Sequence, residues 1–351
     1  ITSYDTNFDC AADYNKNRFA KFTPVWYNKL FVKGDDSVSN GKQQTNNIGG
    51  QAVIEGVMMR GKKIYAMAVR NPEGEIVVEK KPVGGLGKKG LFRYPIFRGM
   101  AAFVDSLVTG TKILMRSAEI AGEGWEEEEL SPFEQWLKEK LGDKINDILI
   151  YFSVFISLLL GMGLFFVLPV AIGNLFKTLV PTWALGIIEG LIRIAIFLGY
   201  LWLISRMKEI KRVFQYHGAE HKTIHAYEND LPLTVENVRA QSRLHPRCGT
   251  NFLLIVMVVS IFVFAFLGWP NLLERIVSRV LLMPVVAGIA YEFIRFAGRS
   301  ESSFVKSLVK PGMALQYMTT REPEADQIEV AIRALEEVRP PEEDAYEDET
   351  Y

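Results

Sequence analysis

The chain has 351 residues, and its 40 Lys and Arg nearly balance its 41 Asp and Glu, for a formal net charge of −1. This balance provides no overall basic charge for nucleic acid, so we expect no nucleic-acid partner. The two cysteines, Cys10 and Cys248, do not form a disulfide framework. Long uncharged apolar stretches alternate with dense runs of charge, which indicates an integral membrane protein whose first partner is the lipid bilayer.

Residues 1–47 mix Asn, Asp, Lys and aromatic residues without a persistent helical or strand period, so we expect a tail or a foreign segment. Residues 48–95 are predicted to form a small cytoplasmic β unit. Within it, β-rich runs at 64–70 and 75–80 flank Asn-Pro-Glu-Gly at 71–74, a signal for a hairpin turn. Because an isolated hairpin is marginally stable, the unit must pack on the cytoplasmic loop or on the membrane helices.

A further strand is predicted within residues 49–61, where Glu55 has apolar neighbours. A charge in such surroundings needs a partner, and Arg60 or a metal ion could supply it. The alternative is a strand face that is simply exposed to water.

Residues 96–146 are predicted to form an amphipathic and then acidic helical segment. Residues 96–120 are apolar on one face but contain charged residues, among them Arg98, Asp105 and Lys112. We therefore expect a helix that lies on the membrane surface or packs on the bundle, with a fifth membrane crossing as the weaker alternative. Residues 123–140 are acidic at first and then favour a helix.

Four apolar stretches within residues 147–300 are predicted to cross the membrane. A helix needs about 20 apolar residues to span a hydrocarbon core of about 30 Å. The fourth stretch is less clean because it carries three charged residues. The expected fold is an α-helical polytopic membrane protein with about four transmembrane helices, amphipathic surface helices and the small β unit. The four stretches cover about residues 148–170, 183–204, 251–269 and 276–296.

The loop at residues 205–250 is rich in Lys and Arg, whereas the short connection near 176–181 has only Lys177. The positive-inside rule places this loop in the cytoplasm, and an even number of spans places both termini there. Residues 301–351 are predicted to be a cytoplasmic amphipathic helix followed by an acidic tail. That helix covers 322–338 and starts at its proline.

Ionisable residues inside the predicted spans are costly and normally face the bundle interior. Glu189 and Arg193 are four residues apart in the second span, and Glu292 and Arg295 are three apart in the fourth. We expect two local ion pairs that help the bundle to pack. The alternative is a polar cavity that leads to a cytoplasmic site.

All four histidines lie between residues 217 and 245, and His217, His221 and His225 are each four apart, which places them on one helix face. Two imidazoles one turn apart can chelate a divalent metal, most suitably zinc. His-x-x-Glu-His at 217–221 is also the inverted zincin pattern. In this interpretation His217 and His221 bind the metal, and Glu220 takes a proton from water that the metal has acidified.

The third ligand has several candidates. His245 and Cys248 are spaced His-x-x-Cys in a segment with Pro246 and Gly249, which could turn a ligand back to the helix. The sequence does not choose among them, and it leaves open a closed structural site or a metal-free cluster that binds lipid phosphates with nearby Lys and Arg. In order of expectation, the candidates are His245, Glu228, Cys248 and His225.

Several motifs resemble the YqhQ-like family of bacterial polytopic membrane proteins, over about residues 48–338. This family is a domain of unknown function described as predicted metal-dependent enzymes. The resemblance implies a bacterial plasma-membrane location. The chain retains all positions of the His-x-x-Glu-His motif. The matching motifs lie at residues 50–60, 216–222, 242–250, 319–323 and 327–331.

Together these features predict a membrane-embedded, zinc-dependent hydrolase with a peptidase-like site on the cytoplasmic face. Its substrates would be membrane proteins, or phospholipid in place of a peptide. The alternative is a non-catalytic assembly or scaffold factor for client membrane proteins, in which the metal site is structural. A transporter is a third and weaker option, because four spans without an internal repeat argue against it. The oligomeric state stays open.

Overall fold

A computed structural model describes most of the unit Gln44–Tyr351. The predicted tail at 1–47, the acidic segment at 123–140 and the acidic tail from 340 onwards lie outside the described residues. The described residues are 48–84, 92, 94–122, 145–267, 271–297, 300 and 302–339.

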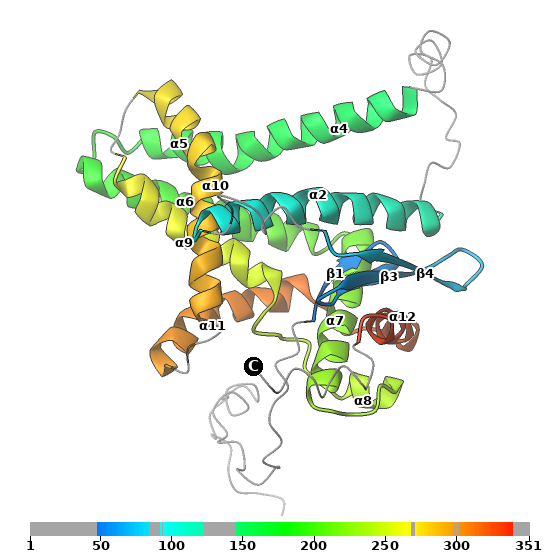
Figure 1. Cartoon of the computed structure of the whole chain (residues 1–351). Helices are drawn as coiled ribbons and strands as arrows, with labels where there is room; N and C mark the ends of the chain where they lie inside the picture. The colour runs from blue at the N-terminus through cyan, green and yellow to red at the C-terminus, as the bar shows by residue number, and fades with distance from the viewer. Residues whose placement is uncertain are drawn as a thin grey trace, which may run out of the picture. The chain divides into compact units, whose positions relative to one another are not determined.

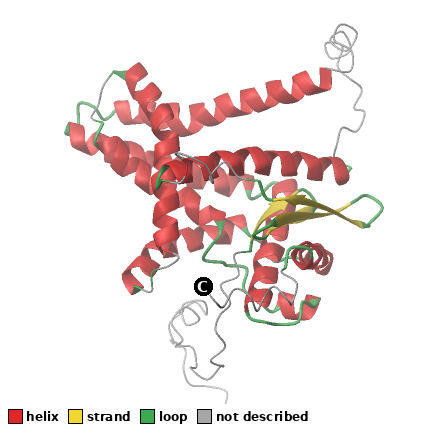
Figure 2. Ribbon diagram, in the orientation of Figure 1, coloured by secondary structure: helices red, strands yellow, loops and turns green. Residues whose placement is uncertain are grey.

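The described chain is mostly helical and contains one small sheet (Figure 2). The sheet has four antiparallel strands in the order β1-β2-β3-β4, and β3 and β4 form the hairpin expected from the sequence. The strands are β1 Gly49–Val53, β2 Gly56–Arg60, β3 Ile64–Arg70 and β4 Ile76–Pro82. The helices outside the predicted spans are α2 Phe97–Ile120, α7 Lys208–Glu228, α8 Val235–Arg239, α11 Ser303–Thr319 and α12 Ala325–Glu336.

Three helices of the described chain are long and apolar enough to cross a membrane: Phe152–Asn174, Ala184–Ile204 and Leu273–Ala297. The helix at the third predicted span is also apolar, but its 17 residues make it shorter. The described structure therefore agrees with the predicted helical membrane class through three candidate spans and a small antiparallel sheet. The helices in this region are α4 Ile145–Met162, the π-helical turn η4 Gly163–Val167, α5 Leu168–Asn174, α6 Thr182–Ile204, α9 Gly249–Ala265 and α10 Leu272–Ala297.

Both faces of the sheet are covered by helices (Figure 1). Successive side chains of a strand point to opposite faces, so Val57 and Met59 pack toward α7 and α12, while Met58 packs toward Ile113 of α2. This explains why the β unit is so apolar for a segment outside the predicted spans: both of its faces are buried.

Helix α12 occupies the middle of the amphipathic helix predicted at 322–338. Its N-terminus has a capping box, in which Glu324 and Gln327 each bind the other residue's backbone. Helix α11 was missed by the sequence analysis. Pro311 and Gly312 in its middle disfavour a helix on intrinsic propensity, and packing against α9 outweighs that preference.

One of the two predicted ion pairs inside the spans is present, and the other has a different partner. Glu189 accepts a hydrogen bond of 2.8 Å from Arg193, as its spacing predicts. Glu292 pairs with Arg98 of α2 through hydrogen bonds of 2.5–3.0 Å, and not with Arg295. Spacing within one helix could not reveal this partner, because Arg98 lies far away in the sequence.

Glu55 also has a partner from a distant element. It lies in the turn between β1 and β2 with a positive φ of 49° and forms a bidentate pair with Arg212 of α7. The hydroxyl of Tyr216 lies 3.2 Å from the same carboxylate. The expectations of Arg60 or a metal as the partner were therefore wrong, and the pair joins the β1–β2 hairpin to α7.

Helices α2 and α10 approach each other through glycines. A methyl group added at Gly288 would lie 2.6 Å from the carbonyl oxygen of Ile96, closer than real contacts allow. We expect Gly288→Ala to destabilise the protein by about 1–3 kcal/mol through overpacking, seen as a lower thermal midpoint in detergent. Gly161→Ala is the matched control, because its added methyl meets nothing within 4 Å. Equal effects of both substitutions would contradict this account of the α2–α10 contact.

Candidate metal centre

Helix α7 presents the three regularly spaced histidines, and the segment before α9 returns the fourth to them. The ring centroids of His217 and His221 are 4.4 Å apart. His245 lies 5.6 Å from His221 and 4.7 Å from His225 by the same measure. The sequence segment that was expected to turn back to the helix therefore does so.

Cys248 and His245 are placed by contacts that the sequence analysis did not foresee. Cys248 is the N-cap of α9, where its sulfur accepts a hydrogen bond from the backbone of Thr250. Gln316 of α11, which is fully buried, accepts from the backbone N–H of His245 and donates to its carbonyl, both at 2.8 Å. The available signal in the sequence was Gln316, a lone amide within the otherwise apolar or aromatic run 313–318.

His217, His221 and Cys248 form the first of two groups that could hold a metal. Their ligand atoms all lie within 4.8 Å of one another. The Nδ1 atom of His217 is 2.8 Å from the carbonyl oxygen of Thr319, and that of His221 is 2.6 Å from the carbonyl oxygen of Arg243. Because a carbonyl only accepts, both Nδ1 atoms must carry the proton, and both Nε2 atoms keep a lone pair for a metal.

The free nitrogen of His221 is the unusual atom of this group. Its Nε2 is buried and has no hydrogen-bond partner among the described residues. The Nε2 of His217, by contrast, lies 3.2 Å from the sulfur of Cys248. Buried polar atoms without a partner are rare in folded proteins and destabilise them, so this nitrogen indicates a ligand.

His225, Glu228 and His245 form the second group, which also meets the distance criterion of 4.8 Å. In this group Nε2 of His225, both ring nitrogens of His245 and the carboxylate of Glu228 already have protein partners. His225 donates to the carbonyl of Leu244 at 2.9 Å, and His245 lies 3.4 Å from Glu228. The guanidinium of Arg247 pairs with Glu228, and its backbone N–H donates to His245 at 3.3 Å. Of the two candidate groups, the geometry therefore favours the first, in which Cys248 is the third potential ligand.

Burial shifts the pKa values of His221, His245 and Cys248. It lowers the pKa of His221 well below the usual range and that of His245 to about 4, so both rings are neutral at neutral pH. Neutral imidazole is the form that binds metals. Burial raises the pKa of the Cys248 thiol, and a bound cation would oppose this effect by stabilising the thiolate.

Glu220 is only 5% exposed and lines the same cavity as the first group. Burial raises the pKa of its carboxyl to about 7, partly offset by His217 and by a hydrogen bond from the backbone of Gly50. A methyl group at Gly50 would lie 2.8 Å from the Glu220 side chain, so a larger residue there would displace that carboxyl. A carboxyl that titrates near neutrality is suited to accept and return a proton.

The cavity measures about 360 Å³ and lies between β1, α7 and the first turn of α9. Its volume falls at the lower end of those typical of small-molecule sites. One part of its wall is apolar, and the polar part is formed by His217, Glu220, His221, His245, Arg247 and Cys248.

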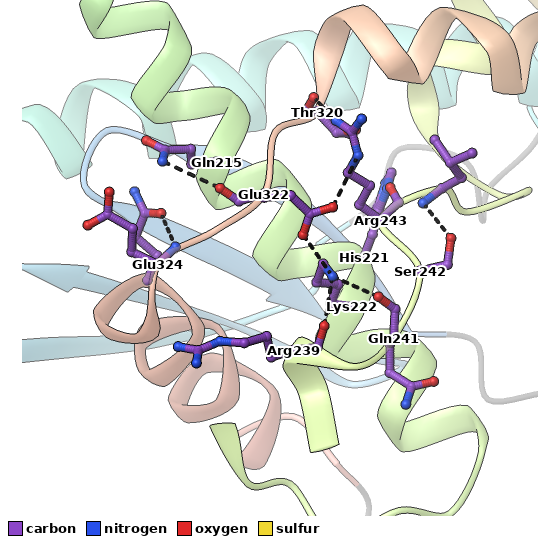
Figure 3. A network of polar contacts seen from close by, with 12 residues as sticks. Gln215, His221, Lys222, Arg239, Gln241, Ser242, Arg243, Thr320, Glu322 and Glu324 are labelled. Carbon is purple, nitrogen blue, oxygen red and sulfur yellow. Dashed lines mark hydrogen bonds and ion pairs between the residues drawn. The ribbon is translucent and has the colours of Figure 1, made fainter. Parts of the chain in front are cut away.

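A network around Lys222 holds the loop that supplies the carbonyl to His221 (Figure 3). Lys222 is buried, and its ammonium donates at 2.8 Å to the carbonyls of Arg239, at the end of α8, and of Gln241 in the loop, and pairs with Glu322 at 3.0 Å. Arg243 donates to the carbonyl of Thr320 at 2.6 Å and pairs with the same carboxylate. These contacts tie the loop to the α11–α12 connection, directly after Thr319, the last residue of α11, which supplies the other carbonyl.

The chain has relatives of unknown function. A family model described as "Protein of unknown function (DUF1385)" matches residues 94–340. The chain is 39% identical over 300 residues to "Uncharacterized protein YqhQ" of Bacillus subtilis (strain 168), covering 83% of this chain and 91% of the relative. No solved structure matches the chain.

Substitutions in the two groups should have different effects on zinc affinity. We expect Cys248→Ala to weaken zinc binding by more than about 100-fold, since it removes a ligand, whereas loss of an outer partner has smaller effects. Glu228→Gln, at a residue already paired with Arg247, should change the affinity by less than about tenfold. Competition with a chromophoric chelator measures both. The opposite order would place the metal in the second group.

The raised pKa of Glu220 predicts a pH dependence for the metal-free protein. Its folded-state pKa of about 7 exceeds its ordinary value of 4.5, so its contribution to stability is complete below pH 4.5 and is lost as pH rises through 7. The loss amounts to roughly 3 kcal/mol. Glu220→Gln cannot titrate, so its thermal midpoint should rise relative to wild type between pH 5 and 8. A constant difference over this range would contradict the buried, titrating carboxyl.

Proposed function

Because this chain belongs to the DUF1385 family of proteins of unknown function, its activity must be argued from its site, and we propose that it is a membrane-embedded, zinc-dependent hydrolase. His217, His221 and Cys248 are the ligands in this proposal, and Glu220 is the general base. The observation that carries the proposal is the buried, unpartnered Nε2 of His221, which lies within 4.8 Å of the ligand atoms of the other two.

Three protein ligands suit a catalytic site better than a structural one. Structural zinc sites are closed by four protein ligands, whereas catalytic sites use three and leave one position open. The backbone carbonyls that hold both Nδ1 atoms correspond to the outer partners that orient metal-binding histidines in zinc enzymes.

The roles of the residues follow from their chemistry. Zinc in such a site supplies Lewis acidity toward water and toward a substrate carbonyl. Glu220 accepts one proton from the attacking water and returns it to the leaving nitrogen or oxygen as the scissile bond breaks. The N–H of Gly50 holds the Glu220 carboxylate in place, and the Nε2 atoms of His217 and His221 stay available as ligands because their Nδ1 atoms are bound to carbonyls.

The membrane location of the site is part of the proposal. We take α9 as the fourth span, since it is uncharged over its 17 residues, and Cys248 caps its first turn. The site then lies at the cytoplasmic surface of a bacterial plasma membrane, on the side of the basic loop at 205–250. Substrates carried by the membrane, such as membrane proteins, would reach it laterally.

A structural metal in a non-catalytic assembly or scaffold factor is the second candidate. The nearness of the His245 ring to His221, with 5.6 Å between centroids, favours it, because His245 could provide a fourth ligand. A closed site would join α7 to the start of α9 and, through Gln316, to α11. It would leave Glu220 without a chemical role.

Elemental analysis is the first test. We expect about one zinc per chain in the protein purified in detergent, and a loss of that zinc in the double variant His217→Ala/His221→Ala. Loss of His225 is the matched control, since it lies on the same helix face but outside the first group, and His225→Ala should keep its zinc. A wild-type protein without metal after zinc supplementation would rule out the hydrolase.

Glu220→Gln then separates the two candidates. It should retain zinc and fold while slowing hydrolysis of a quenched fluorescent peptide mixture by about 100-fold or more, because it removes the general base. Unchanged zinc together with unchanged activity would show that the hydrolysis does not come from this site. Zinc without activity in the wild type, and with four protein ligands by X-ray absorption spectroscopy, would favour the structural candidate.

A further inference from the structure

Strand β1 is an edge strand, and its outer edge faces the cavity of the candidate metal centre. It pairs with β2 on one side, and no strand of the described chain pairs with it on the other. The cavity is lined by residues 48–52 together with α7 and the first turn of α9. An unpaired strand edge presents a row of backbone donors and acceptors, so the cavity contains a template for another strand.

The register of the hairpin tells which backbone groups point into the cavity. Val53 pairs with Gly56 across a two-residue turn, which makes them a hydrogen-bonded pair in an antiparallel ladder. Hydrogen-bonded pairs alternate, so Gln51 also faces β2, while Gly50 and Ala52 direct their N–H and C=O groups outward. The hydrogen bond from the Gly50 N–H to Glu220 agrees with this assignment.

Within the described chain, three groups therefore remain for a ligand: the carbonyl of Gly50 and both the N–H and the carbonyl of Ala52. The small residues of β1 leave room for a ligand, since a methyl group at Gly49 would meet nothing within 4 Å. Glycine in a strand often marks a place where another backbone approaches closely. The apolar walls that could receive side chains come from Phe214, Ile224 and Leu253.

We propose that the outer edge of β1 binds an extended polypeptide segment as an added strand and so directs a peptide carbonyl toward His217, His221 and Cys248. The proposal rests on the proposed function in taking these three residues as metal ligands. Two of the three free groups on β1 are carbonyls, which need N–H donors. A peptide backbone supplies donors and acceptors in alternation, whereas a phospholipid ester supplies acceptors alone.

The substrate is then an unfolded or extended part of a protein, such as a loop or a chain end near the membrane surface. A helical segment has its backbone groups paired internally and cannot add to a strand. Selection would come chiefly from backbone accessibility, with apolar side chains preferred at the positions that face Phe214 and Leu253.

Hydroxamates of increasing complexity test the proposal on the zinc-loaded protein in detergent. Acetohydroxamate reports an open metal position alone, and octanohydroxamate adds apolar bulk without amides. A leucyl-phenylalanyl-alanine hydroxamate adds a backbone, and its control carries N-methyl groups on the internal amides. By titration calorimetry, we expect the tripeptide to bind at least about tenfold more tightly than octanohydroxamate, and N-methylation to remove that gain.

A protein variant tests the same hydrogen bonds from the other side. Ala52→Pro removes the outward N–H without removing a bond to β2, which edge strands tolerate. It should weaken the tripeptide by about tenfold and leave acetohydroxamate unchanged. Ala52→Ser is the matched control, because it keeps the N–H at nearly the same side-chain size. Should Ala52→Pro fail to fold, the N-methylated tripeptide on the wild-type protein decides.

The outcomes separate this proposal from the proposed function. If acetohydroxamate binds but the tripeptide binds no more tightly than octanohydroxamate or its N-methylated form, the edge proposal is overturned and the open metal site stands. If octanohydroxamate binds most tightly, the site takes acyl chains instead of a polypeptide. If no hydroxamate binds the zinc-loaded protein, the metal is closed off and both proposals fail.

Discussion

Two backbone carbonyls determine the chemistry of the candidate centre. Those of Thr319 and Arg243 accept hydrogen bonds from the Nδ1 atoms of His217 and His221, which leaves both Nε2 atoms as acceptors. If the proton of either ring moved from Nδ1 to Nε2, the Nδ1 lone pair would face a carbonyl oxygen, and the hydrogen bond would be lost. The tautomers that metal binding requires are therefore set by the fold before any ligand arrives.

The carbonyl of Arg243 belongs to a loop and that of Thr319 to the last residue of α11, and a polar network holds both. Buried Lys222 joins the loop before α9 to Glu322, next to the α11–α12 connection. Buried Gln316 joins α11 to the backbone of His245. Buried polar groups stabilise a structure only when they are fully paired, so this network and the orientation of the histidines stand or fall together.

The β unit and the metal centre are mechanically connected as well. The Glu55–Arg212 pair fastens the β1–β2 hairpin to α7, and the Gly50 backbone then meets the Glu220 carboxyl. In the proposed hydrolase, the hydrogen bond from Gly50 would position Glu220 beside anything bound along that edge. The arrangement would suit a hydrolase that binds extended chains. It would also suit a structural contact whose stability depends on pH, but only the hydrolase would use the open cavity.

The sequence by itself determined the apolar helices, the β3–β4 hairpin, the helix that carries His217, His221 and Glu220, and the amphipathic α12, because each depends on local periodicity or turn chemistry. It ranked His245 above Cys248, whereas the structure groups Cys248 with His217 and His221, and it could not pair Glu292 with Arg98 or find α11. Those depend on contacts between segments far apart in the chain, and such contacts leave no periodic signal. Only the tertiary structure divided the six candidate ligands and base into one group with an unpartnered nitrogen, one group closed by Arg247, and a buried carboxyl on the strand edge.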